Sequence, residues 1–133
     1  MSRLSRHAVL LVGFVIGLGL WLLPAQFLGV AEPWDGNSPA YPLALFATGL
    51  LLGLLPPGRP GAVASGVFLG QLAVLLWRVV RSPETSELWL VGVVMLAGYT
   101  FVATGAGALL GSFIRRRLAG PDVDRRRVPD RRA

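Results

Sequence analysis

Cysteine and lysine are both absent from this sequence of 133 residues, and only seven residues are acidic. The lack of cysteine excludes a disulfide framework, a thiol nucleophile and a thiolate metal site. Charged residues make up 15% of the chain, whereas an average soluble protein has about 25%. They are concentrated near the two ends and in short gaps between long uncharged runs. This distribution argues against a soluble domain and indicates helices that cross a membrane.

The thirteen basic residues are all arginine, and the chain also holds 17 glycines and 10 prolines. This composition is typical of bacteria with GC-rich genomes, so we expect a bacterial protein. A net charge of +6 would suit nucleic acid in a soluble protein, but basic residues in a membrane protein report topology first. We therefore expect no nucleic-acid partner.

Four apolar runs predict an all-α integral membrane bundle of four transmembrane helices, because each is long enough, or nearly so, to cross a hydrocarbon core of about 30 Å. The predicted spans lie at about 8–31, 40–56, 61–77 and 88–114. Together they form one membrane domain over residues 1–118. The remaining segment, 119–133, is rich in Arg, Asp and Pro and predicts a disordered tail.

The arginines predict the direction of the spans. Eleven of them fall on the side of the two termini, while only Arg78 and Arg81 fall on the other. The positive-inside rule then places both termini in the cytoplasm, in a multi-pass protein of the bacterial inner (plasma) membrane. An alternative remains open, because residues 1–31 also resemble a signal peptide whose cleavage would leave three spans.

Each predicted span contains a Gly-x-x-x-Gly motif. In lipid, helices associate through close backbone approach over small residues, so these glycines are predicted helix-packing positions. The motif does not say whether the partner helix belongs to the same chain. The eight glycines are Gly13, Gly17, Gly49, Gly53, Gly66, Gly70, Gly107 and Gly111.

Two short matches suggest a repeated helical hairpin. The segment 13–17 recurs at 66–70, and Ala-Thr-Gly at 47–49 recurs at 103–105, so the two offsets are similar but not identical. A duplicated hairpin would give a parallel repeat about an axis along the membrane normal. Coincidence among a few residue types is the alternative.

The predicted spans contain no ionisable side chain apart from tyrosine, which removes the usual residues for proton relays and helical metal sites. Among their polar residues, Thr48, Gln71 and Thr104 are the candidate lining of a solute path. Gln71 is the most informative of them, since an amide in an apolar helix must face other helices or water. An interhelical hydrogen bond with a structural role is the alternative for Gln71.

Two further regions carry polar or charged side chains. The first outer loop contains Glu32, Trp34, Asp35 and Tyr41, which we interpret as an interface anchor; contact with a cation or an extracytoplasmic partner is the alternative. Arginines at 115–117 (Arg115, Arg116 and Arg117) are expected to contact anionic lipid headgroups at the cytoplasmic face.

No nucleophile elbow, phosphate-binding loop or metal-ligand spacing occurs in the sequence, so we expect neither an enzyme nor a cofactor or metal site. The leading hypothesis is a small polytopic protein that acts through helix–helix contacts. It would be an accessory subunit of a membrane complex or a homo-oligomer. The alternative is a channel or facilitator for a small neutral solute.

Overall fold

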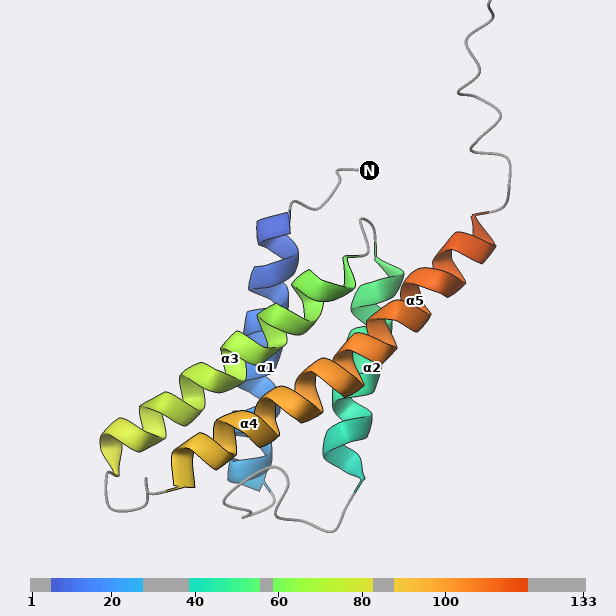
Figure 1. The fold of residues 1–133 in the computed structure, drawn as a ribbon. Helices are drawn as coiled ribbons and strands as arrows, with labels where there is room; N and C mark the ends of the chain where they lie inside the picture. The colour runs from blue at the N-terminus through green and yellow to red at the C-terminus, as the bar shows by residue number, and fades with distance from the viewer. Residues whose placement is uncertain (1–5, 28–38, 56–58, 83–87, 120–133) are drawn as a thin grey trace, which may run out of the picture.

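The computed structural model describes residues 6–27, 39–55, 59–82 and 88–119, and within these ranges all regular structure is helical (Figure 1). The elements, in chain order, are α1 (Arg6–Phe27), α2 (Ala40–Leu54), α3 (Pro60–Arg81), α4 (Trp89–Tyr99), the π-helical segment η2 (Thr100–Thr104) and α5 (Gly105–Leu118). The chain passes from α4 through η2 into α5 without a break, so these three form one long helix. The predicted tail lies outside the described residues, apart from its first residue, Ala119.

Three of the described helices are long and apolar enough to cross a membrane: α1, α3 and the continuous helix from Trp89 to Leu118. The second helix, α2, is apolar but has only 15 residues. At 1.5 Å per residue it extends about 22 Å, which is less than a hydrocarbon core of about 30 Å. Its described length therefore falls short of the fourth span that the sequence predicts.

The helix boundaries follow the apolar runs closely, with two extensions and one irregularity. The helix α5 continues beyond the predicted end at residue 114 and ends at Leu118. The third helix continues beyond the predicted end at residue 77 and includes Arg78 and Arg81 in its last turn. These two arginines lie over the rings of Trp21 and Trp77, at 5.9 and 4.7 Å from the ring centroids. Cation–π contacts hold the two guanidinium groups at the end of the helix. The two charged residues can therefore form part of its last turn.

The irregularity is η2, which the sequence pattern did not predict. A π turn holds more residues than an α turn, so an extra residue rotates the following helix by about 100° about its axis. The rotation changes the neighbour of the long helix, because α4 packs on α3 whereas α5 packs mainly on α2. One continuous span therefore serves both halves of the bundle.

The bundle consists of two closely packed pairs, α1 with α3 and α2 with η2–α5. The third helix joins them, since it also contacts α4, η2 and α5. The beginnings of α1 and α3 lie at the same end of the bundle as the ends of α2 and α5, in the upper part of Figure 1. We call this the arginine end, because Arg6, Arg59 and the arginines at 115–117 belong to it.

Large apolar side chains cover much of the outer surface. Leu11 on α1, Leu51 on α2 and Val102 in η2 are 64%, 64% and 73% exposed. The buried side chains form two small clusters, one around Trp21 and Leu96 and one around Leu45. An apolar exterior around a small interior is the arrangement expected for helices in lipid, where apolar side chains need not be hidden.

Candidate functional site

The first pair of helices meets along glycines. Gly13 and Gly17 of α1 face the backbone of α3, where a side chain at Gly13 would come within 3.1 Å of the Val63 carbonyl oxygen. Gly66 and Gly70 of α3 face the backbone of α1 in the same way. All four glycines are buried. The two helices therefore approach to backbone contact, as small residues allow in a membrane.

The second pair repeats this arrangement. Gly49 and Gly53 of α2 lie against the backbone of Thr104 and Ala108, while Gly107 and Gly111 lie against α2. A Cβ atom at Gly107 would be 2.9 Å from the Leu50 amide nitrogen. The structure thus places all eight motif glycines at contacts inside the chain, which leaves none of the eight free to receive another protein.

The contacts in the first pair are reciprocal in register. Gly13 meets Val63 and Gly66 meets Leu10. The number of residues from position 13 to position 66 equals the number from position 10 to position 63. The contact of Gly13 with Val63 and the contact of Gly66 with Leu10 are therefore the same contact with the two helices exchanged. The sequence segments 13–17 and 66–70 are offset by this same number of residues.

The second pair is reciprocal too, but in a register of its own. Gly49 meets Thr104 and Gly107 meets Phe46, and the shift that relates 49 to 107 also relates 46 to 104. The Ala-Thr-Gly match aligns position 49 with position 105 instead, so it is not the register in which these helices pack. The packing shift also relates Tyr41 to Tyr99, whose rings are in edge contact at 6.1 Å.

A buried polar cluster lies where α2, α3 and η2 meet. Gln71 is completely buried, and its Oε1 accepts hydrogen bonds from the Tyr41 hydroxyl at 3.1 Å and the Thr100 hydroxyl at 2.8 Å. Its Nε2 atom and the buried Thr104 Oγ1 have no hydrogen-bond partner within the described part of the chain. An unsatisfied buried donor is costly, which makes this cluster the strongest candidate for a polar site inside the bundle.

The π-helical segment helps to build this cluster. Thr100 and Thr104 are its first and last residues, and both are fully buried. A single π turn inside a longer helix often marks a functional position, because it redirects side chains that a regular helix would place elsewhere. Here it places two threonines toward the interior between α2 and α3.

Of the three residues predicted to line a path, two are fully buried. Gln71 and Thr104 are both buried on facing elements, whereas Thr48 is only half-buried and takes no part in the hydrogen bonds to Gln71. Tyr41, which donates a hydrogen bond to Gln71, belongs to the cluster but was not predicted to do so. Its assignment to the outer loop was wrong. It is the second residue of α2, because Pro42 fits in the first helical turn, where a backbone N–H is not needed.

The other outer-loop residues, Glu32, Trp34 and Asp35, lie outside the described residues. So do the remaining acidic residues, and the described part of the chain therefore contains no carboxylate side chain. Within that part, no three residues of the metal-ligating types form a group.

The predicted lipid-contact arginines differ from one another. Arg115 donates a hydrogen bond from Nη1 to the Leu55 carbonyl oxygen at 2.9 Å, at the C-terminal end of α2. A cation there offsets the negative end of the helix dipole and satisfies a free carbonyl. Arg117 lies over the Phe113 ring at 5.1 Å, and Arg116 is exposed.

Sequence reasoning singled out neither Trp21 nor Leu96, although both belong to the interior. Trp21 follows Gly13 and Gly17 at steps of four residues, so it lies on the glycine face of α1. That spacing was a usable signal. Leu96 has no comparable signal, since apolar residues surround it in the sequence.

Comparison of the chain with protein-family models, with curated proteins and with solved structures finds no match. What the protein does must therefore be inferred from its own geometry.

Proposed function

We propose that the protein is a four-span protein of a bacterial inner membrane, with both termini in the cytoplasm, that acts through helix contacts with another membrane chain. Three spanning helices support the membrane placement. Arg6 and Arg59 stand at the beginnings of α1 and α3, and the arginines at 115–117 in the last turn of α5, and these helix ends lie at one end of the bundle. This supports the direction, by the positive-inside rule. In this proposal α2 is the fourth span, and its short length is accommodated by local thinning of the bilayer or by adjacent residues.

The topology can be tested with single cysteines, since the natural chain has none. A membrane-impermeant maleimide should label Ser82→Cys, at the end of α3, on intact spheroplasts. Ala119→Cys, beyond α5, should be labelled only after lysis. The reverse pattern would contradict the proposed direction. Labelling of both positions on intact spheroplasts would show that the helix from Trp89 to Leu118 does not cross the membrane.

We also propose that residues 1–31 stay attached. The first helix covers Gly66 and Gly70 of α3, and its removal would leave that glycine face without its partner. The purified protein should therefore have the intact mass of 14.2 kDa. A lower mass that matches the loss of segment 1–31 would show cleavage.

Reciprocal packing supports a repeated hairpin as well. In both pairs a helix of the first hairpin lies beside its counterpart from the second, with glycine opposite glycine. The contacts run in the same chain direction on both helices, so the pairs are parallel. We propose that α1–α2 and α3–α5 are copies of one hairpin related by a pseudo-two-fold axis along the membrane normal.

The contact function rests on an open groove between α2 and α4–η2. It has a volume of about 620 Å³ and is almost entirely apolar. Its lining residues are Pro42, Val94, Met95, Gly98, Tyr99, Val102 and Ala103. Gly98 is exposed, and a Cβ atom added to it would meet nothing within 4 Å. A glycine on a lipid-facing groove permits the close backbone approach that a partner helix needs.

Cysteine cross-linking can test this surface. Gly98→Cys should form a cross-linked product in native membranes, and Leu11→Cys, on the exposed face of α1, should not. A product of twice the chain mass identifies a homo-oligomer, whereas another defined mass identifies a subunit of a larger complex. A monomer in mild detergent that also gives no cross-link at position 98 would refute the proposal.

The buried cluster favours a second function, a facilitator for a small neutral solute. The free Nε2 of Gln71 and the Thr104 hydroxyl offer a donor and an acceptor inside the bundle, and the titratable side chain bonded to Gln71 within the described residues is the Tyr41 phenol. Proteoliposomes should then conduct glycerol or urea faster than empty liposomes. Gln71→Leu should remove the excess flux and Thr48→Val should keep it; equal flux in all variants would rule out this route.

A further inference from the structure

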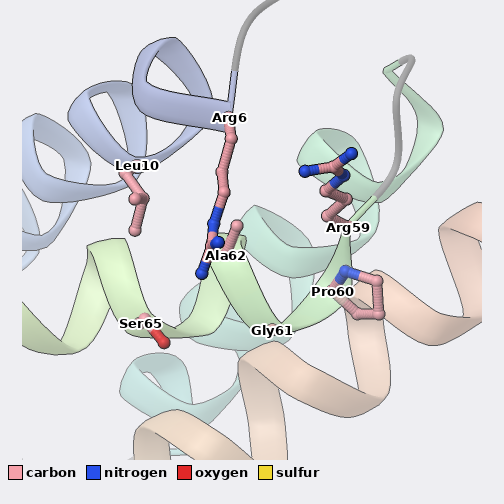
Figure 2. A pocket seen from close by; sticks show the side chains of 7 residues that line it. All are labelled: Arg6, Leu10, Arg59, Pro60, Gly61, Ala62 and Ser65. Carbon is pink, nitrogen blue, oxygen red and sulfur yellow. The ribbon is translucent and has the colours of Figure 1, made fainter.

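A basic hollow lies between α1 and the beginning of α3, at the arginine end of the bundle. Its volume is about 520 Å³. Arg6 and Leu10 of α1 form one side, while Arg59 and Ser65 are among the residues that α3 and its N-cap contribute. Figure 2 shows Arg6 reaching from α1 to the first turn of α3, with the Arg59 side chain across the space from it.

These two arginines are unlike most others in the described part of the chain. Arg78 and Arg81 lie over tryptophan rings, and Arg115 binds a backbone carbonyl. Arg6 and Arg59 have no such ring or carbonyl contact within the described residues, and no described carboxylate is available to either. Two like charges that share one hollow repel each other, and an anion between them would relieve that repulsion.

The donors of the hollow come from side chains. Two amides in the first turn of α3 are already used, since Ala62 and Val63 both donate to the Arg59 carbonyl oxygen at 3.0 and 3.2 Å. Each guanidinium offers five N–H donors in a planar arrangement that suits phosphate oxygens. Ser65 also lines the hollow, and its hydroxyl adds a weaker donor (Figure 2).

We propose that this hollow binds a phosphate group, held between the guanidinium groups of Arg6 and Arg59 with Ser65 as an additional donor. Both arginines stand at helix beginnings, which is the level of the headgroups if α1 and α3 span the bilayer. Leu10 and Ala62 add apolar walls beside the charges. A phosphodiester with an attached acyl chain matches this combination, and a soluble phosphate shares the same recognition chemistry.

Binding can be measured on the full chain in a neutral detergent by native mass spectrometry. Phosphatidylglycerol should be retained at one molecule per chain more strongly than phosphatidylcholine. The double variant R6Q/R59Q should weaken this retention about 10-fold or more, because it removes both charged donors. The matched control is R78Q/R81Q, which removes the same charge at the other end of α3, outside the hollow, and should change retention less than about 2-fold.

A second titration distinguishes the source of the phosphate. Inorganic phosphate added at millimolar concentration should leave lipid retention unchanged if the site is built for a lipid headgroup. Displacement of the lipid would assign the site to soluble phosphates. Equal retention of the two lipids, together with no phosphate binding, would overturn the proposal, as would an equal loss in both double variants. The SDS concentration at which each variant unfolds, compared with that of the natural chain, verifies that the substitutions leave the bundle folded.

Discussion

Alanine at Gly107 should destabilise the bundle, whereas alanine at Gly105, two residues away on α5, should not. A Cβ atom at Gly107 would collide with the α2 backbone at Phe46 and Leu50, which cannot rotate away as a side chain could. Overpacking of this kind costs about 1–3 kcal/mol. At Gly105 a Cβ atom would meet nothing within 4 Å.

The net effect also includes helix propensity. Replacing glycine by alanine in a helix gains about 1 kcal/mol. We therefore expect Gly107→Ala to lower the free energy of unfolding by up to about 2 kcal/mol and Gly105→Ala to raise it by up to about 1 kcal/mol. The difference in the free energy of unfolding between the two variants isolates the cost of backbone contact, because both variants carry the same substitution in the same helix.

The assay is reversible unfolding in mixed micelles with increasing SDS, followed by tryptophan fluorescence. The reciprocal contacts add an internal check, since Gly49 faces the backbone of Thr104 as Gly107 faces that of Phe46. Gly49→Ala should therefore lower stability to a similar extent. If Gly105→Ala proves as destabilising as Gly107→Ala, the glycine contacts do not hold α2 against α5 and the reasoning fails.

Two further predictions concern the side-chain hydrogen bonds. A double-mutant cycle with Gln71→Leu and Thr100→Val should give a coupling of about 0.6–1.7 kcal/mol in the same unfolding assay, as for other hydrogen bonds between membrane helices; additive effects would show that the bond contributes nothing. Arg115→Ala should lower stability by about 1 kcal/mol because it removes the donor to the Leu55 carbonyl, while Arg116→Ala should have no effect. Equal effects of the two arginine variants would mean that general charge, and not the contact with α2, is responsible.

Much of the helical content was determined by the sequence. In lipid a backbone must satisfy its hydrogen bonds within its own segment, so apolar runs predict helices wherever prolines and charges allow them. The consecutive Pro56 and Pro57 ended the second run, and α2 ends at Leu54. Glycines four residues apart share one helical face in any fold, so the packing faces were also readable without a structure.

Tertiary structure decided which faces meet. Pairing depends on the relative rotation and height of helices that are far apart in the sequence, and glycine spacing contains no such information. The same limit hid the polar cluster, because Tyr41 and Thr100 are both far from Gln71 in the sequence and meet it only after α2 and η2 have packed on α3. The π turn could not be read from the apolar pattern, which continues unchanged through residues 89–114.

The scarcity of charged residues also has one aspect that the sequence determined and one that the tertiary structure decided. By itself the sequence determined that few ionisable groups enter the spans, since each would be costly in hydrocarbon. The structure decided what the arginines at the helix ends contact: two tryptophan rings, one phenylalanine ring, one free carbonyl, and one hollow that Arg6 and Arg59 share. Composition fixes the number of such charges, whereas their partners depend on where the helix ends come together.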